Sequence, residues 1–369
     1  MKIKDKHFRS IWLHPENEKV VQIIDQRWLP HQFLVSNLQT VEDVETAIKE
    51  MWVRGAPLIG ATAAWGMYLS TFEMPPERNM TDYFSGVYDR LLNTRPTAVN
   101  IKWALDKMMD AVSDNDHIKE TAWYAKTRAQ WLCDADVETN KKIGEHGLKI
   151  IEDISIKKNG GTINILTHCN AGWLATVDWG TATSPIYHAH DRGINIHVWV
   201  DETRPRNQGA HITSWELLQQ GVLHTLIADN AAGHLMQNGL VDMVIVGTDR
   251  TSVHGDVCNK IGTYTKALAA YDNHIPFYVA APSSSIDFNM QDAFAEIVIE
   301  ERHPDEVKYV QGLLNGTIQK VLIAPAGTPA KNFAFDITPA QYITGIITER
   351  GICSADKYSI LELFPEKKH

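Results

Sequence analysis

The hydrophobic pattern divides the chain into two parts that meet near Gly160. Before this point apolar residues recur every three or four positions, which predicts helices. The first helix follows Thr40 and Asp43, whose spacing is that of a capping box, and the second starts at Pro57. Further helices are expected at 80–92, 99–112, 116–132 and 134–149. Residues 20–30, VVQIIDQRWLP, instead predict an early strand and turn.

After Gly160, short apolar runs alternate with helical stretches. Six runs predict buried strands: TINILTHC, INIHVWVDE, HTLIADN, VDMVIVGTD, IPFYVAAP and KVLIAP. Helices are expected between them at 213–220, 231–237 and 262–273. Near-continuous apolar strands fit a parallel sheet that is covered on both faces, and their alternation with helices predicts a doubly wound α/β domain.

The length and the net charge of the chain limit the classes of protein to which it can belong. The chain has 369 residues, which suggests two domains or one large domain with an extension, and its net charge is −10. That charge argues against a nucleic-acid partner, although a local basic pocket for one phosphate is compatible with it. The uncharged stretch between Ala56 and Glu73 is too short for a membrane span and predicts a buried helix, so no membrane partner is expected. The first residues lack an apolar signal region and the four cysteines are widely spaced, so we expect a cytoplasmic protein without a disulfide framework or a zinc knuckle.

Reactive residue types gather directly after the predicted strands. They occupy 167–172, 201–209, 247–250, 259–262 and 282–285. Because ligands of open parallel sheets bind beyond the carboxyl ends of the strands, these segments predict one site at one sheet edge. Each residue taken alone has a structural alternative. Cys169 fits an inert buried thiol, Asp249 fits an ion pair with Arg250, and Glu202 fits an ion pair with Arg204.

A second signal is the segment 54–57, Arg-Gly-Ala-Pro, which precedes a predicted helix. A helix N-terminus offers free N–H groups and a favourable dipole, glycine permits close approach of an anion, and arginine adds a charged fork. The alternative is an ordinary Gly-Pro loop with a surface arginine. Arg95 and Lys260 are candidates for further positive charge at the same phosphate. An acidic protein with a few such cations fits a small phosphorylated metabolite better than a polymer.

Taken together, the motifs resemble the methylthioribose 1-phosphate isomerases, a family related to the regulatory subunits of eukaryotic initiation factor 2B and to archaeal ribose 1,5-bisphosphate isomerases. The matching segments are RGAPLIGATAAWG, NTRPTAVN, THCNAG, DETRPRNQGA, GTDR, NKIGTY, FYVAAPSS and FAFDITPAQYITGIITERG, in this order along nearly the whole chain. The resemblance implies an α/β fold in two domains. A smaller, mainly helical N-terminal domain with a small β-sheet is placed at residues 1–135. A Rossmann-like catalytic domain with a doubly wound parallel sheet is placed at residues 136–369.

Site residues follow from the resemblance by position. It implies that Cys169 and Asp249 are catalytic. It places substrate contacts on Arg54, Gly55, Ala56, Arg95, Gln208, Asn259 and Lys260. It also implies that a homodimer isomerises a sugar phosphate, from aldose 1-phosphate to ketose 1-phosphate, in methionine salvage. No metal and no other cofactor is expected.

Such a substrate makes demands on both catalytic residues. Its anomeric oxygen carries the phosphate, so an acid must assist ring opening before hydrogen moves from C2 to C1. Asp249 suits this role if an apolar pocket raises its pKa. Cys169 suits either a thiolate base in an enediolate route or the support of a direct hydride shift.

Rival functions stay open at this point. One is the isomerisation of 5-deoxyribose 1-phosphate, which lacks only the methylthio group, or of ribose 1,5-bisphosphate. Another is a non-catalytic subunit of the initiation factor 2B type, which has no need of the pair Cys169 and Asp249. A dinucleotide-binding oxidoreductase is disfavoured because no G-x-G-x-x-G segment follows a predicted strand.

Overall fold

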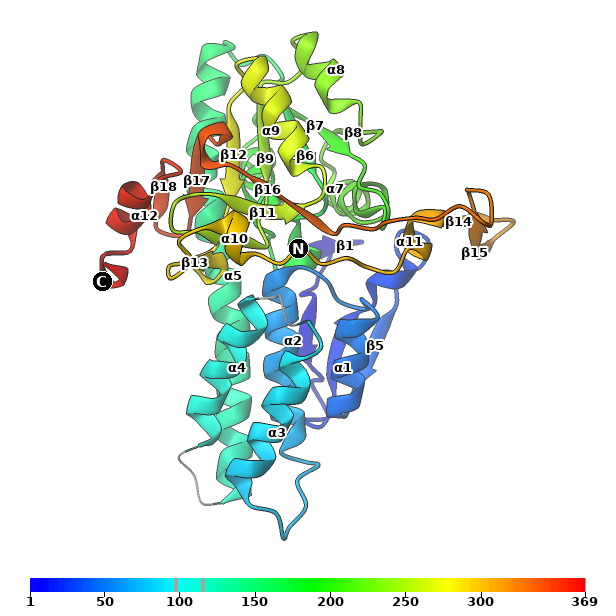
Figure 1. The fold of residues 1–369 in the computed structure, drawn as a ribbon, viewed down its shortest axis with the longest axis vertical. Coiled ribbons are helices and arrows are strands. Elements are labelled where there is room, and N and C mark those ends of the chain that lie inside the picture. Colours follow the sequence, from blue (N-terminus) through cyan, green and yellow to red (C-terminus); the bar gives the residue numbers. More distant parts are fainter. Residues whose placement is uncertain (96–98, 114–116, 369) are drawn as a thin grey trace.

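The computed structural model describes residues 1–95, 99–113 and 117–368. The molecule is elongated, with a mainly helical part at one end and an α/β part at the other (Figure 1). The chain passes once from the helical part into the α/β part through a long helix, and the N-terminus lies at the junction of the two (Figure 1).

The helical part packs its helices against a three-stranded antiparallel sheet. The strands are β3 (Ile11–Leu13), β4 (Val21–Ile24) and β5 (Val35–Leu38), and the helices are α1 (Val41–Lys49), α2 (Ala56–Ser70), α3 (Met80–Leu92) and α4 (Val99–Val112). The predicted capping box is confirmed. Asp43 N donates to Thr40 Oγ1 at 3.0 Å, and Thr40 N donates to the Asp43 carboxylate at 3.0 Å. Helix α2 is buried along almost its whole length, as its uncharged sequence predicts, and forms the centre of the apolar core.

One helix, α5 (Ile118–Lys157), connects the two parts. Its earlier residues, such as Ala129, join the core around α2, and its later residues, such as Ile151, pack against the large sheet. The helices expected at 116–132 and 134–149 are therefore one element, although residue 116 lies outside the described residues. The domain boundary expected between residues 135 and 136 falls inside this helix, so a continuous helix and not a loop joins the two parts.

The α/β part is built on a seven-stranded sheet with the order β18-β17-β12-β9-β6-β7-β8. Its strands are β6 (Ile163–His168), β7 (Ile196–Asp201), β8 (His224–Ile227), β9 (Met243–Val246), β12 (Phe277–Ala280), β17 (Gly345–Thr348) and β18 (Gly351–Cys353). All neighbours pair in parallel except β17 and β18. One face is covered by α5, α6 (Thr183–Asp191) and α7 (Ser214–Gln220), and the other by α8 (Ala232–Gln237), α9 (Thr263–Asp272) and α12 (Lys357–Leu363). The predicted doubly wound fold is confirmed.

Two strand predictions differ from the structure, and one strand of the large sheet was not predicted. HTLIADN, expected to be buried, forms β8 at the edge of the sheet, where Thr225 and Leu226 are exposed. KVLIAP, expected as a buried strand, instead ends an exposed antiparallel ribbon of β14 (Tyr309–Leu314) and β15 (Thr317–Leu322). An inner position of the sheet goes to β17, which the apolar runs did not predict. An apolar run alone does not distinguish an inner strand from a ribbon.

Smaller sheets complete the junction. A four-stranded sheet has the order β13-β10-β11-β16, with strands Ile286–Asp287, Arg250–Ser252, Val257–Lys260 and Phe335–Thr338. Between β13 and β16 the chain runs through α10 (Ala293–Glu296), α11 (Asp305–Lys308) and the β14–β15 ribbon, which projects from the side of the molecule (Figure 1). A two-stranded sheet of β1 (Lys2–Ile3) and β2 (Lys6–His7) lies beside α7. This arrangement brings segments from the whole chain to the carboxyl edge of the large sheet.

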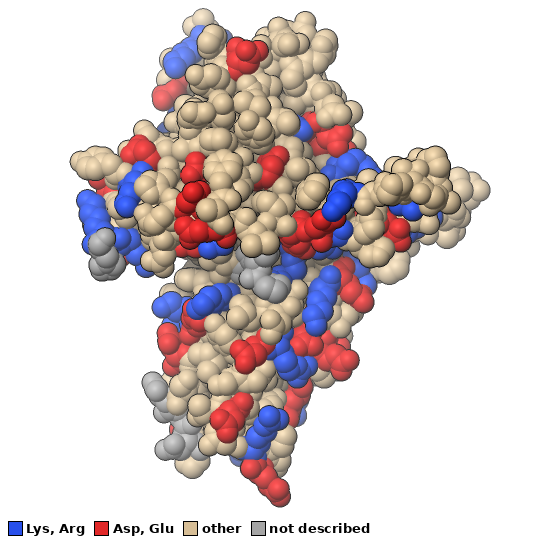
Figure 2. Space-filling view, in the orientation of Figure 1, with Lys and Arg blue, Asp and Glu red and all other residues tan. Residues whose placement is uncertain are grey.

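The surface and the helices add two observations. On the face drawn in Figure 2, lysine and arginine side chains lie among acidic ones, mainly around the junction and the helical part. That face therefore offers no continuous basic surface. Within the described ranges, no helix combines the length and the apolar character that crossing a bilayer requires.

Candidate active site

One hollow at the junction of the two parts is lined by every residue that the sequence predicts for the site. These residues are Arg54, Gly55, Ala56, Arg95, Cys169, Gln208, Asp249, Asn259 and Lys260. The empty space between these side chains amounts to about 660 Å³, part of which is open to solvent. Four of the five predicted loops reach the hollow. The fifth, 282–285, turns toward α4, where Ser284 Oγ accepts a hydrogen bond from Asn100 Nδ2 at 3.0 Å.

Cys169 follows β6 directly and has a left-handed backbone, with φ of 66°. Two threonine side chains hold it in place. The Cys169 N–H donates to Thr203 Oγ1 at 2.8 Å, and its carbonyl accepts from Thr213 Oγ1 at 2.6 Å. Such a backbone is costly for a residue with a side chain and persists only where the surroundings enforce it. The buried thiol lies 3.9 Å from Arg54 Nη2, so it faces a cation in the hollow and not only apolar neighbours.

The segment 54–57 forms the opposite wall. Arg54 donates from Nη1 to the Asn170 side-chain oxygen at 2.6 Å and from Nη2 to the Asn170 carbonyl at 2.9 Å. Gly55 has a φ of 93°, and a Cβ there would lie 2.3 Å from the Ala175 carbonyl oxygen, so only glycine fits. Helix α2 starts immediately afterwards, at Ala56. The predicted helix N-terminus with an adjacent arginine therefore faces the cysteine loop.

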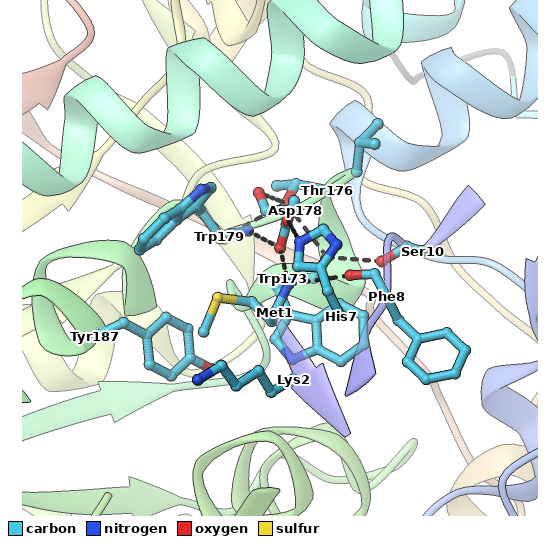
Figure 3. Close-up of polar contacts among 12 residues, drawn as sticks. Met1, Lys2, His7, Phe8, Ser10, Trp173, Thr176, Asp178, Trp179 and Tyr187 are labelled. Atoms are coloured by element: carbon cyan, nitrogen blue, oxygen red, sulfur yellow. Dashed lines mark hydrogen bonds and ion pairs between the residues drawn. The ribbon is translucent and has the colours of Figure 1, made fainter. Parts of the chain in front are cut away.

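The loop at 170–181 is fixed by residues from the start of the chain (Figure 3). Asp178 accepts hydrogen bonds from the Met1 amino group at 2.5 Å and from His7 Nε2 at 2.8 Å. The same carboxylate accepts from Trp179 N at 2.9 Å (Figure 3). The position of the cysteine loop therefore depends on contacts that cross more than 170 positions in the sequence.

Glu216 of α7 lies behind the same loop, and no motif or spacing in the sequence indicated its role there. It accepts from Leu174 N at 2.7 Å and from the Tyr187 hydroxyl at 3.2 Å. Burial raises the pKa of Glu216 to about 7, although hydrogen bonds from the loop oppose that rise. A Cβ on Gly172 would lie 1.6 Å from a Glu216 oxygen, so the glycine of the motif makes room for this carboxyl group.

Asp249 follows β9 and faces the hollow. Its expected alternative partner, Arg250, instead binds Asp287 at 2.5 Å. The second expected ion pair is also wrong. Glu202 accepts from backbone N–H groups, including Thr203 N at 2.6 Å, while Arg204 donates to main-chain carbonyls at residues 306–309 and within its own loop. These two side chains shape the 201–209 loop through the backbone.

Burial dominates the electrostatics of the site. It raises the pKa of Asp249, while the cations of Lys260 and Arg95 oppose the rise and the carboxylate of Glu300 adds to it. Burial also lowers the pKa of Lys260, and the neighbouring groups of Cys169 and Asp249 oppose that change. The raised pKa is the condition that the acid role of Asp249 requires, because the carboxyl group then keeps its proton closer to neutral pH.

Three further predicted residues present polar groups to the hollow. Asn259 is held by its Nδ2, which donates to Thr263 Oγ1 at 3.0 Å. Arg95 donates from Nη2 to Glu300 at 3.0 Å, and the Pro-Thr pair that follows it, 96–97, lies outside the described residues. Within the described part of the chain, Arg95 Nε and Gln208 Oε1 are buried without a hydrogen-bond partner. Buried polar atoms of this kind are uncommon, and a bound ligand would satisfy them.

The sequence did not indicate two residues that contact the predicted site residues, Phe335 and Glu300. The Lys260 Nζ atom lies over the Phe335 ring, 5.1 Å from the ring centroid. The position of Phe335 in the segment FAFDIT did not predict this contact. Glu300 lies 205 positions from Arg95 in the sequence, in a segment without a motif. Neither contact leaves a local pattern, so only the fold reveals it.

Comparison with known proteins agrees with this architecture. The model of the Initiation factor 2 subunit family matches residues 52–355, and the chain belongs to that family. Within it, the chain is 53% identical over 367 residues to a Methylthioribose-1-phosphate isomerase from Desulfatibacillum aliphaticivorans, with 100% of both chains covered. This identity places it in the methylthioribose-1-phosphate isomerase branch.

Solved structures agree as well. The 5-methylthioribose 1-phosphate isomerase of Pyrococcus horikoshii OT3 superposes with a TM-score of 0.83 at 41% identity, covering 98% of this chain and 97% of that one. A protein of A. fulgidus described as translation initiation factor eIF-2B, subunit delta, gives a TM-score of 0.79 at 36% identity, covering 97% and 100%. Both kinds of protein therefore share this fold.

Proposed function

We propose that the chain isomerises S-methyl-5-thioribose 1-phosphate to the ketose methylthioribulose 1-phosphate, a step of methionine salvage. The observation that carries the proposal is the meeting of all nine predicted residues in one hollow between the two parts. The full-length likeness to proteins that bear this isomerase name supports it.

Binding of the phosphate is assigned to the helical side of the hollow and to Lys260. Arg54, the N-terminus of α2 and Arg95 supply two guanidinium groups and free N–H groups. Gln208 Oε1, which has no partner among the described residues, is available to a sugar hydroxyl. These contacts hold the sugar with its C1 and C2 atoms toward the sheet edge, where orientation itself lowers the barrier.

Asp249 is assigned the role of acid. It donates its proton to the ring oxygen as the bond between that oxygen and C1 breaks, which is why a raised pKa is needed. In the enediolate route the Cys169 thiolate takes the C2 proton and the Asp249 carboxylate takes the proton of the C2 hydroxyl. The enediolate that forms then accepts a proton at C1 from the Cys169 thiol, which leaves the ketone at C2. In the other route the C2 hydrogen moves to C1 as a hydride, and the Asp249 carboxylate takes the proton of the C2 hydroxyl.

Phosphorus and carbon NMR of the purified protein with methylthioribose 1-phosphate tests the proposal. The expected result is a ketose 1-phosphate signal that is lost in Cys169→Ser and in Asp249→Asn. In D2O, solvent deuterium at C1 identifies the enediolate route, and retention of the C2 hydrogen identifies the hydride shift. Parallel samples contain 5-deoxyribose 1-phosphate and ribose 1,5-bisphosphate. No turnover of any of the three sugars contradicts the proposal and favours a non-catalytic subunit.

We also propose a cytoplasmic homodimer in which residues 1–135 and 136–369 act as two domains. The exposed apolar side chains Leu313, Leu314 and Val321 on the β14–β15 ribbon support a self-association surface. Light scattering after size exclusion tests the dimer, and cell fractionation tests the compartment. Calorimetry tests the division, because separate domains melt in two transitions, whereas parts coupled through α5 melt in one.

A further inference from the structure

A buried ionic cluster borders the hollow, where its histidine, His168, forms part of the wall, and the proposed chemistry does not use it. His168, the last residue of β6, directs Nδ1 at Asp201 Oδ2 (2.5 Å) and Nε2 at the Ile261 carbonyl (2.9 Å). The ammonium of Lys266 lies 3.0 Å from the same Asp201 oxygen. All three side chains are almost fully buried, with at most 5% exposed.

The geometry requires hydrogen on both ring nitrogens of His168. A backbone carbonyl only accepts, so Nε2 must donate to Ile261. Nδ1 faces Asp201 Oδ2, which also contacts the Lys266 ammonium, and a carboxylate oxygen accepts hydrogen bonds. Burial raises the pKa of Asp336 on β16, and the neighbouring His168 and Lys266 oppose that rise.

The two bonds of His168 connect strand ends that carry site residues. Cys169 follows His168 in the chain, and Lys260 precedes Ile261. Gly262 leaves room for the ring, since a Cβ there would lie 3.1 Å from His168 Nε2. The ring therefore ties the end of β6 to the end of β11 across two different sheets.

We propose that His168, held by Asp201 and Lys266, is a positioning residue that keeps the Lys260 ammonium beside the Cys169 thiol. The inference deepens the proposed function, on which it rests for its kinetic part. The Lys260 and Cys169 side chains both line the same hollow, which supports their proximity. If the link to Ile261 is lost, Lys260 moves away from the thiol while the fold and the sugar contacts of the helical side remain.

Two amide substitutions separate the two hydrogen bonds of the ring. In His168→Gln the side-chain amide reaches the place of Nε2 and donates to Ile261. In His168→Asn the shorter side-chain amide reaches only the place of Nδ1, so it donates to Asp201 and leaves the Ile261 carbonyl without this donor. We expect kcat to fall about 100-fold in the Asn variant, the effect of a displacement of roughly 1 Å at a reacting centre, and about tenfold in the Gln variant. Equal losses, a larger loss in the Gln variant, or unchanged kcat in both would overturn the proposal.

Alkylation of Cys169 by iodoacetamide without substrate gives a readout that does not depend on the proposed reaction. Rates are followed from pH 6 to pH 9, and peptide mass spectrometry separates Cys169 from Cys353. A thiol loses reactivity at neutral pH when a neighbouring cation is removed. We expect the Asn variant to react about tenfold more slowly at pH 7 and to need a higher pH, with the Gln variant close to wild type. His197→Asn, on β7 and bonded to Thr225, is the matched control and should not change the profile.

Several charged groups near the Cys169 thiol influence its alkylation rate in the wild type and in the variants. They are Lys260, Asp249, Arg54 and Arg95 in the hollow and Asp201, Lys266 and Asp336 behind it. Identical alkylation profiles in all variants overturn the inference even if the isomerase reaction is confirmed. Conversely, the expected alkylation order supports it even if no sugar phosphate is turned over.

A measurement on the wild-type chain covers the case in which either variant fails to fold. In protein labelled with ¹⁵N-histidine, the inference requires one ring with hydrogen on both nitrogens and slow exchange with solvent at pH 7.5. Absence of such a ring overturns the inference.

Discussion

The two sides of the hollow are built in different ways. On the sheet side, Cys169 and Asp249 directly follow inner parallel strands, and buried hydrogen bonds fix the backbone of each. On the helical side, Arg54 precedes a helix N-terminus, and Arg95 lies in a connection between helices that is tied across the junction by an ion pair with Glu300. The rigid side carries the proposed chemistry, and the side that depends on an ion pair carries the proposed binding.

This difference has a kinetic consequence. Cys169 and Asp249, which are held by the large sheet, should affect the chemical step, whereas the residues of the helical side and Lys260 should affect the binding of the phosphate. Arg54 is the exception, because its guanidinium also contacts Asn170 and the Cys169 sulfur. Changes at Arg54 should therefore mix both effects, so it is a poor test of the comparison.

The largest expected effect is on the sheet side. Cys169→Ser and Asp249→Asn should each lower kcat by about 10³-fold, because a positioned acid or base contributes that much to such a step. The dissociation constant of the substrate, measured by calorimetry on each inactive variant, should change by less than about threefold. A large loss of binding in either variant would contradict the division of roles between the two sides.

The next effect is on the helical side. Arg95→Met should raise KM by about 30-fold, corresponding to the loss of about 2 kcal/mol of charge-assisted hydrogen bonding, with kcat nearly unchanged. Steady-state kinetics measure both constants. The control is Arg90→Met on α3, which removes a surface ion pair with Glu45 at 3.0 Å and should leave KM unchanged. A fall in kcat without a rise in KM would place Arg95 in the chemical step.

The same contrast explains what could be predicted from the sequence. β6, β7, β9 and β12 were predicted because inner parallel strands form continuous apolar runs. β17 was missed because its run of four residues, GIIT, lies inside a motif and has no flanking turn signal. KVLIAP was assigned to the wrong sheet because its apolar character contains no information about its partner strand.

The prediction of site residues is limited in the same way, because local sequence does not identify partners that are distant in the chain. Cys169 and Asp249 could be proposed from the sequence because they follow predicted strands and lie in motifs. The contact of Arg95 with Glu300 and that of His168 with Asp201 join residues that are 205 and 33 positions apart. Such pairs depend on how strands and loops meet in space, so hydrophobic periodicity and local motifs do not reveal them.

A smaller effect tests whether Glu300, which pairs with Arg95 across the junction, influences the pKa of Asp249 on the sheet side. Glu300 raises the pKa of Asp249, so Glu300→Gln should lower it. If Asp249 acts as the protonated acid, activity falls as pH rises through this pKa, and the variant should lose kcat/KM at lower pH than the wild type. The pH profile of kcat/KM measures the shift. Glu301→Gln, which removes an exposed pair with Lys331, is the control and should keep the wild-type profile. A shift toward higher pH would contradict the assignment of Asp249 as the acid.

The smallest effect tests whether the helical part supports the site only as a scaffold. Thr40→Ala removes the side-chain acceptor of the capping box on α1, which should cost about 1 kcal/mol of stability. Neither α1 nor its cap lines the hollow, so kcat and KM at 25 °C should stay at wild-type values while the midpoint of thermal unfolding falls. Thr127→Ala on α5 is the control, because its hydroxyl donates to the Trp123 carbonyl within a helix and caps no helix end. If loss of the cap lowers kcat although the protein is folded, then α1 transmits its position through α2 to the Arg54 segment. In that case the helical side is part of the catalytic apparatus, and the contrast between a rigid chemical side and a binding side fails.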